Sequence, residues 1–219
     1  MVGLQFSGQI PGFDMAVRYG PDLNVGMPIF FKTGKNLLIG VEANYFYGSS
    51  IRETIMSNLL TSSGSITDLN GNPGAIRMNE RGADAFVTLG KVFNKLGPNK
   101  NSGLMIMVGA GYIGHKIDIV DLAHNIPQIE GNYVKGYDRL TGGPAASQFV
   151  GYLFLSKRRM INLYFGFEFI EGFTTGLRSY QYDLMGPDNK RRFDLLSGFR
   201  LGWILPMYLT RAEQKFYYY

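Results

Sequence analysis

The chain has 219 residues, no cysteine and a formal net charge of +5, with 45% hydrophobic and 18% charged residues. This length fits one all-β domain, and no stretch approaches the roughly 20 apolar residues of a spanning helix, which excludes a helical membrane protein. The missing cysteines exclude disulfides, thiolate metal sites and cysteine nucleophiles, and the basic residues fall in turns rather than on the continuous basic face of a nucleic-acid-binding protein.

Large apolar residues alternate with small or polar ones at period two in a series of short segments. One parity of the clearest segment carries Leu37, Ile39, Val41, Ala43, Tyr45 and Tyr47. The other parity carries Gly40, Glu42, Asn44 and Gly48. Successive side chains of a strand point to opposite faces, so each segment has one apolar face and one face of glycine and polar groups. An apolar parity this continuous and aromatic is typical of a strand in a transmembrane β-barrel.

Eight segments fit this template, and we predict strands over 3–9, 22–32, 37–49, 83–95, 103–118, 144–156, 160–173 and 191–206. Short connections alternate with the long ones 10–21, 50–82, 119–143 and 174–190. Outer-membrane barrels have short periplasmic turns and long extracellular loops, which places both termini in the periplasm. The last strand can then pair with the first and leave no edge in lipid. The predicted fold is an all-β, eight-stranded antiparallel up-and-down transmembrane barrel over 1–206, with a periplasmic tail over 207–219.

Two residues depart from this alternation, and a third fits the expected membrane boundary. Pro28 lies inside a predicted strand and predicts a bulge or a strand end, because proline cannot donate to the ladder. Lys91 falls on the apolar parity and would have to snorkel to the interface. Trp203 lies near the periplasmic end of the last strand, where an aromatic girdle is expected. The start of the chain, Met1–Gly20, lacks a secretory signal, so we expect that signal to have been removed or replaced.

The longest connection, 50–82, contains apolar residues at helical spacing. Ile51, Ile55 and Leu59 recur every fourth position before a glycine- and asparagine-rich run at 70–74. We predict a short helix here. It either lies on the barrel rim or docks a partner protein.

A Gly-x-Gly-x-x-Gly string is formed by Gly109, Gly111 and Gly114. A dinucleotide-binding loop needs this string to end a strand and open a helix, but here it lies inside a predicted strand. The glycines more simply make room for bulky neighbours inside a narrow barrel, and we expect no cofactor.

The two histidines, His115 and His124, are too few for a metal site built on histidine. His115 lies near the outer end of a predicted strand, with Asp118 and Asp121 close by in sequence. It is either a structural histidine of the lumen or rim, or one half of a catalytic pair at the rim. The chain has no hydrolase or phosphate-binding motif.

Parity places four charged residues inside the barrel, where charges must pair because isolated buried charges are costly. These residues are Glu42, Glu168, Asp194 and Arg200. An eight-stranded interior is just wide enough for side chains to fill, so we interpret the four as a polar plug. A proton-linked or solute-binding role is the alternative.

The chain resembles the small eight-stranded outer-membrane barrels of Bacteroidota, which are similar in architecture to OmpX and OmpW. The resemblance rests on Asn101–Asp118 with its Asn-Ser-Gly-Leu-Met start, Lys135–Leu140 with Gly-Tyr-Asp-Arg-Leu, and the ending Glu213–Tyr219. It implies a role as a fixed subunit of an envelope machine, such as one that inserts or exports outer-membrane proteins. The aromatic ending departs from the pattern, because it lies beyond the last strand instead of closing it.

These observations together predict a non-enzymatic outer-membrane barrel that contacts lipid, lipopolysaccharide and other envelope proteins. The candidate partner-binding residues are Ile51, Ile55 and Leu59 in the long loop and Phe216, Tyr217, Tyr218 and Tyr219 in the tail. Four consecutive aromatic residues are enriched at interfaces, although they could also form a targeting signal or fold against the barrel. The alternatives are a barrel enzyme acting on lipid or peptide through His115, and a soluble lipocalin-like carrier.

Overall fold

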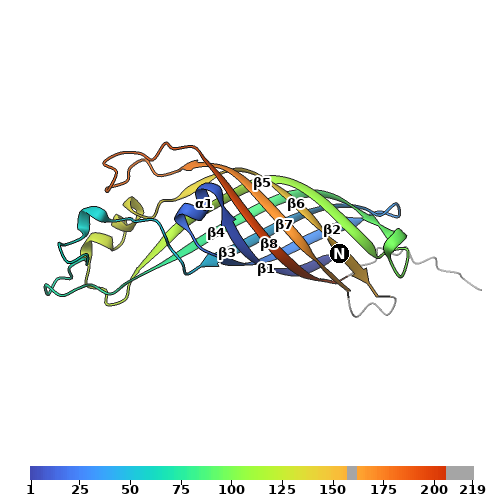
Figure 1. Cartoon of the computed structure of the whole chain (residues 1–219), viewed down its shortest axis with the longest axis horizontal. Coiled ribbons are helices and arrows are strands. Elements are labelled where there is room, and N and C mark those ends of the chain that lie inside the picture. Colours follow the sequence, from blue (N-terminus) through green and yellow to red (C-terminus); the bar gives the residue numbers. More distant parts are fainter. Residues whose placement is uncertain (157–161, 206–219) are drawn as a thin grey trace, which may run out of the picture.

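The structure, a computed structural model, describes residues 1–156 and 162–205 (Figure 1). Eight antiparallel strands close into a barrel in sequence order, and the ladder from Val2↔Leu205 to Gly12↔Leu195 joins the last strand to the first. The strands are β1 (Val2–Gly12), β2 (Asp22–Lys32), β3 (Leu37–Gly48), β4 (Ile76–Phe93), β5 (Gly103–Asp121), β6 (Thr141–Leu155), β7 (Asn162–Gly176) and β8 (Arg192–Leu205). The predicted all-β eight-stranded antiparallel barrel is confirmed.

The two ends of the barrel differ. One end, called here the long-loop end, carries the connections 13–21, 49–75, 122–140 and 177–191. The opposite, short-turn end carries the connections 33–36 and 94–102 together with the N-terminus (Figure 1). The described part of the chain contains one α-helix, α1 (Phe13–Arg18), and four 3-10 turns at Ser57–Leu59, Asn94–Leu96, Pro127–Ile129 and Tyr133–Gly136. Among the described residues, no helix combines the length and the apolar character needed to cross a membrane.

The barrel wall is apolar outside and polar inside. Large side chains exposed on the outer face include Leu4, Phe6, Ile29, Phe31, Val41, Val87, Val108, Phe165, Phe167, Phe199 and Leu201. Buried side chains that face inward include Gln5, Glu42, Asn44, Asp84, Glu168 and Arg200. A closed sheet satisfies its backbone hydrogen bonds internally, so this arrangement suits lipid. It is the reverse of a soluble lipocalin-like carrier, and that alternative does not fit.

Five strands extend further toward the long-loop end than the alternation predicted. β4 begins at Ile76 rather than at residue 83, and β6 begins at Thr141 rather than at residue 144. β1, β5 and β7 continue to Gly12, Asp121 and Gly176, beyond their predicted ends at 9, 118 and 173. Polar side chains occur on the outer face here: Arg81 in the added part of β4 pairs with Asp118 of β5, with 2.6 Å between Nε and Oδ2. The wall therefore continues beyond its apolar band, where the sequence pattern ends.

Pro28 marks neither a bulge nor a strand end, so that prediction is wrong. β2 continues to Lys32 in one register with β3, and its register with β1 is the same at Val2↔Ile29 as at Gln5↔Gly26. Pairing with β1 is interrupted only between these two positions. The strand therefore accommodates its missing N–H by a local gap in one ladder.

The helix predicted around Ile51, Ile55 and Leu59 is wrong. Ile51 forms a β-bridge with Tyr19, and the only helical feature in this described segment is the 3-10 turn Ser57–Leu59. Ile55 is buried, and Ile51 and Leu59 pack partly buried against the core at the barrel mouth. The apolar spacing thus reflects an irregular chain that reaches inward at intervals, which leaves no exposed helical face for docking.

The helix α1 was missed by the sequence pattern because its six residues are too few to show a period. It turns Met15 and Arg18 inward and leaves Phe13 outward, in edge contact with Phe193 at 5.0 Å between ring centroids. The carboxylate of Asp14 accepts a hydrogen bond of 2.9 Å from the backbone N–H of Phe193. These contacts fix α1 against the end of β8.

The interior is filled in layers. An apolar cluster at the short-turn end comprises Phe30, Leu38, Val92, Met105, Met107, Phe149, Leu153, Tyr164 and Ile204. A second apolar cluster toward the long-loop end includes Met15, Tyr19, Phe46, Phe86, Ile113, Ile170 and Leu196. Along β8, Arg200 lies between Leu196 of one cluster and Ile204 of the other. A polar layer therefore separates two apolar ones.

Glycines let this interior close. A Cβ on Gly82 would lie 2.1 Å from Cζ of Phe46, and a Cβ on Gly202 would lie 2.1 Å from Cε1 of Tyr164. Gly109 of the Gly-x-Gly-x-x-Gly string faces the Ser147 hydroxyl in the same way, at 2.4 Å. The string lies wholly within β5, so it lacks the strand-to-helix turn of a dinucleotide-binding loop.

Candidate functional site

The polar layer is centred on Arg200, which is buried on the inner face of β8. Its Nη1 lies 2.8 Å from Oε2 of Glu42 on β3, and its Nε donates to Oε2 of Glu168 on β7 at 2.7 Å. The guanidinium also lies over the ring of Phe149, 5.6 Å from the centroid. One buried cation thus bridges two buried carboxylates from strands on different sides of the barrel.

Amide side chains extend this network along the wall. Gln5 donates to the Asn44 side-chain oxygen at 2.5 Å and accepts from the Tyr164 hydroxyl at 2.5 Å. Asn44 in turn donates to Asp84 at 2.5 Å. Gln9 donates to Glu168 at 3.0 Å. The network therefore cross-links strands around the barrel, and it has the character of a fixed plug more than of an open water channel.

Asp194 does not join this network, although its parity placed it with the other three charged residues. Its Oδ2 lies 3.1 Å from Nε2 of His115 and accepts a hydrogen bond of 2.5 Å from the Thr174 hydroxyl. Nδ1 of the same histidine lies 3.3 Å from the hydroxyl of Tyr19. Parity correctly predicted that Asp194 faces the lumen. It could not predict the position along the barrel axis, and Asp194 lies nearer the long-loop end than Arg200 does.

The partners proposed for His115 in a catalytic pair at the rim are wrong. Asp118 lies on the outward parity and pairs with Arg81. Asp121 accepts backbone hydrogen bonds from Asn125 and Ile126 and so shapes the following loop. His115 is buried and contacts Asp194 and Tyr19 instead, as expected of a structural histidine of the lumen.

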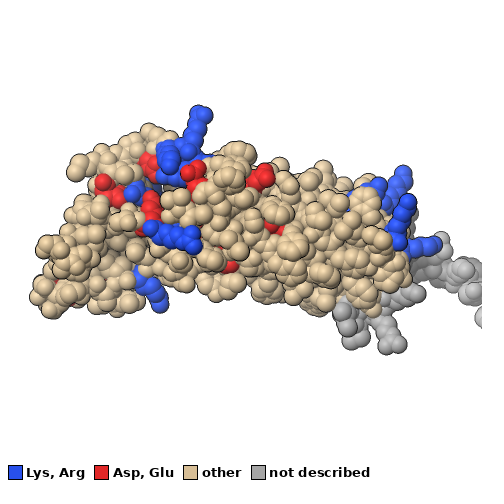
Figure 2. Space-filling model, viewed as in Figure 1, with Lys and Arg blue, Asp and Glu red and all other residues tan. Residues whose placement is uncertain are grey.

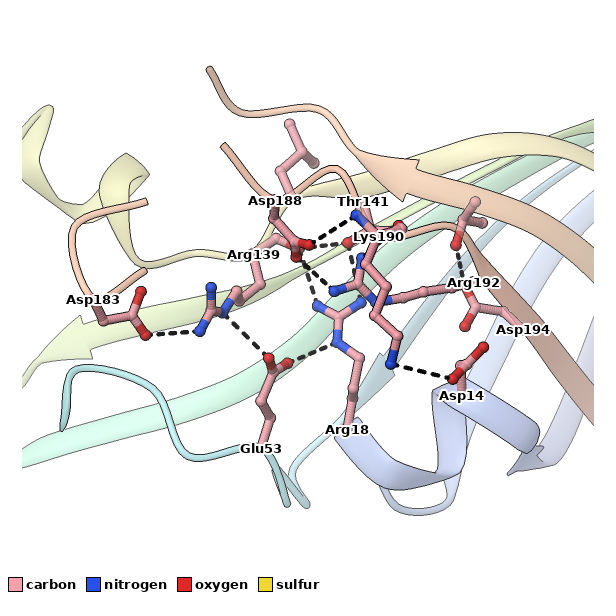
Figure 3. A network of polar contacts seen from close by, with 12 residues as sticks. Asp14, Arg18, Glu53, Arg139, Thr141, Asp183, Asp188, Lys190, Arg192 and Asp194 are labelled. Atoms are coloured by element: carbon pink, nitrogen blue, oxygen red, sulfur yellow. Dashed lines mark hydrogen bonds and ion pairs between the residues drawn. The ribbon is translucent and has the colours of Figure 1, made fainter. Parts of the chain in front are cut away.

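A third polar cluster, at the mouth of the barrel, ties the long connections together (Figure 3). Glu53 accepts from Nε of Arg18 on α1 at 2.7 Å and lies 3.2 Å from Nε of Arg139 in the connection before β6. Nη2 of Arg139 donates to Asp183 in the last long connection at 2.7 Å. Arg18 also donates to the Thr141 hydroxyl at 3.0 Å. Each of the four long connections contributes one member to this chain of ion pairs.

Further ion pairs lie at the mouth. Arg192 lies 2.5 Å from Asp188. Burial opposes ionisation of this carboxyl, but the hydrogen bond and the charge of Arg192, together with the backbone N–H of Lys190 and the charge of Arg139, outweigh it, so the pKa of Asp188 lies below its usual range. Arg178 donates hydrogen bonds to the carboxylate of Asp138, and this pairing raises the pKa of Arg178. These loops are therefore held by charged contacts that sequence parity could not predict, because their members lie outside the alternating segments.

The remaining predicted partner-binding residues, Phe216, Tyr217, Tyr218 and Tyr219, lie outside the described residues, as does the tail 207–219. In the described part of the chain, no group of three or more His, Asp or Glu side chains is arranged to hold a metal ion. The candidate sites are thus the polar network around Arg200 in the lumen and the surface of the four long connections.

Comparisons with known proteins add fold-level likenesses only. No protein-family description and no curated protein matches the sequence. Among solved structures, the Neisserial surface protein A is 9% identical over 92% of this chain and 94% of its own, with a TM-score of 0.43. Ail of Yersinia pestis, in complex with the heparin analogue sucrose octasulfate, is 7% identical over 92% and 95%, with a TM-score of 0.40. The N-terminal barrel of Pseudomonas aeruginosa OprF is 8% identical over 92% and 96%, with a TM-score of 0.37.

Proposed function

We propose that this chain is a non-enzymatic barrel of a bacterial outer membrane and that its long-loop end docks another envelope protein. The apolar outer wall supports the membrane location, because a closed antiparallel barrel is the β-structure that leaves no unpaired backbone in lipid. The layered interior supports a role other than transport, since side chains fill it from the short-turn end to the mouth.

The observation that carries the docking role is a set of apolar side chains on the long connections, away from the barrel wall. This loop patch consists of Leu69, Leu122, Tyr133, Leu184 and Met185. Leu69 is 72% exposed and Met185 is 80% exposed. All five belong to connections at the long-loop end, and exposed apolar surface of this kind marks sites of protein or membrane interaction.

The connections that bear the loop patch are tied to one another. The backbone N–H of Leu69 donates to Asn125 at 3.1 Å, and that of Tyr182 donates to Gly136 at 3.0 Å. The ion pairs at the mouth link the same connections. A patch held in this way is preorganised, and preorganisation reduces the ordering cost of binding.

The same proposal gives the protein an orientation, with the loop patch extracellular, both termini periplasmic, and lipid and lipopolysaccharide around the wall. Single cysteines test it. A cysteine in place of Asn72, which is exposed in a long connection, should react with an impermeant maleimide on intact cells, whereas one in place of Lys95 at the short-turn end should not. The opposite labelling pattern would invert the orientation.

Docking is tested by comparing the proteins that co-purify with three versions of the full chain in mild detergent. The test variant L69S/Y133S/M185S removes three apolar members of the loop patch. The matched control S62A/Q128A/N189A changes three exposed polar residues of the same connections. We expect the test variant to lose the partner quantitatively while the control retains it.

A third variant of the co-purification experiment deletes Phe216–Tyr219. If the deletion abolishes co-purification and the loop variant does not, the docking surface is the tail rather than the loop patch. If the deleted protein fails to reach the outer membrane, the tail acts as a targeting signal. Full retention of every partner by both variants would contradict the docking role.

A further inference from the structure

Among the described residues, the charged side chains at the short-turn end of the barrel are all basic. Five lysines, Lys32, Lys35, Lys91, Lys95 and Lys100, lie on its turns and adjoining strand ends, and we call them the basic rim. Asp and Glu are absent from the described residues at this end, namely 1–4, 28–41, 88–107, 150–156, 162–167 and 201–205. Figure 2 shows blue side chains at this end with no red among them on the visible face, whereas both colours mix at the other end.

Hydrogen bonds between the two turns gather these lysines. Nζ of Lys32 donates to the side-chain oxygens of Asn36 at 2.5 Å and Asn101 at 2.9 Å. The side-chain amide of Asn36 donates to the carbonyl of Lys100 at 3.1 Å. The β2–β3 turn and the β4–β5 turn are thus fixed side by side, which keeps the lysine-bearing segments next to each other.

Lys91 locates the basic rim relative to the apolar band. It lies on the outward parity of β4, two residues before the strand ends at Phe93, and it is exposed. Its Nζ lies over the ring of Phe93, 5.7 Å from the centroid. The side chain therefore reaches past apolar wall toward the strand end, as a lysine does when it snorkels from hydrocarbon to headgroups.

We propose that the basic rim binds the phosphate groups of anionic phospholipids in the leaflet at the short-turn end. The inference rests on the proposed membrane location and adds a lipid class and a set of residues to it. Lysines close to an anionic membrane surface are attracted to it, and each acts as a compact point charge on a flexible stem. Because exposed Phe31 and Phe93 border the lysines directly, headgroups attached to the surrounding acyl chains are the anions within reach.

A tryptophan placed beside the basic rim can report which lipid lies there. Trp203 is the only tryptophan, so the double substitution W203F/F31W moves the reporter to the outer face of β2, next to Lys32. The full chain is reconstituted in vesicles containing brominated phosphatidylglycerol or brominated phosphatidylcholine, and quenching gives the relative binding of the two lipids. We expect a preference of about fivefold or more for phosphatidylglycerol, reduced by high salt.

Two further variants in the reporter background assign the preference. K35Q/K95Q/K100Q removes three exposed lysines of the basic rim and should bring the ratio to about one. K135Q/K190Q/R191Q makes the same change in net charge at the long-loop end and should leave the ratio unchanged. A ratio near one in the unmodified reporter, or a preference that survives loss of the three lysines, would overturn the inference. Quenching by neither lipid would instead overturn the membrane location itself.

Discussion

Arg200 lies 2.8 Å from Glu42 across the barrel lumen, measured from Nη1 to Oε2, although the two residues are 158 positions apart in the chain. Glu168 contacts the same guanidinium from a third strand. Removing one partner of a buried ion pair leaves an uncompensated charge, whereas replacing all partners with neutral groups of similar shape costs far less.

Replacing Arg200 with Met should therefore destabilise the barrel by about 3–5 kcal/mol, because it leaves Glu42 and Glu168 buried without their cation. The triple variant R200M/E42Q/E168Q should recover most of this loss. Denaturant unfolding in lipid vesicles, followed by the gel shift between folded and heated protein, measures both. Equal stability of the single variant and wild type would show that the pair does not hold the lumen.

The close contacts between glycines and aromatic rings in the lumen should make stability sensitive to a single added methyl group. Gly82→Ala forces a methyl group into the ring of Phe46 and should cost about 1–3 kcal/mol of stability, the usual range for overpacking. Gly8 is the control, since a Cβ there would meet nothing within 4 Å. A loss at Gly8→Ala equal to that at Gly82→Ala would mean that backbone freedom, not packing, explains these glycines.

The apolar wall and the loop patch should respond differently to charge. Phe167 is 61% exposed and contacts Phe199 on the outer face, so an arginine there meets hydrocarbon and should cost about 2–4 kcal/mol. Leu69→Arg changes a residue outside the wall that is still more exposed, at 72%, and should leave unfolding in vesicles unaltered. Similar losses at both positions would contradict the placement of the membrane.

The sequence was sufficient for the parts of the fold that repeat. Period-two alternation identified all eight strands and the inward faces of Glu42, Glu168 and Arg200, because lipid outside and crowding inside impose opposite demands on neighbouring positions. On β4 it stopped at residue 83 and missed Arg81, which pairs with Asp118 where the wall leaves the apolar band.

The connections could not be predicted in this way. Their ion pairs join single residues from separate loops, as Glu53 does with Arg18 and Arg139, and no local period marks such contacts. Apolar spacing misled at Ile55, which reaches the core from an irregular chain. Alternation also carries no information on the position of a residue along the barrel axis. Asp194 was therefore grouped with Arg200, although it contacts His115.

Acid should loosen the mouth before it loosens the wall. The pKa of Asp188 lies below its usual range in the folded protein, so the unfolded chain binds its proton more readily. The stability from this group is present above the ordinary aspartate pKa of about 4 and is lost as the pH falls through the lower folded value. In Asp188→Asn this part of the acid dependence should vanish. An unchanged profile of protease sensitivity at the loops against pH would contradict the assignment.

The final prediction is that the purified protein forms no stable channel in planar bilayers. Eight strands enclose a space that side chains fill, and here two apolar layers and the Arg200 network occupy it along its length. The apolar layer at the short-turn end is tightly packed. Met105, Phe149 and Tyr164 are buried there, and a Cβ on Gly151 or Gly166 would clash with Phe149, as one on Gly202 would with Tyr164. The variant M105A/F149A removes bulk from that layer and keeps the charges, so its conductance should exceed that of wild type. Discrete ohmic openings from wild-type protein alone would contradict a filled lumen and favour a pore, whereas silent wild type beside a leaky variant would show that packing is what closes the barrel.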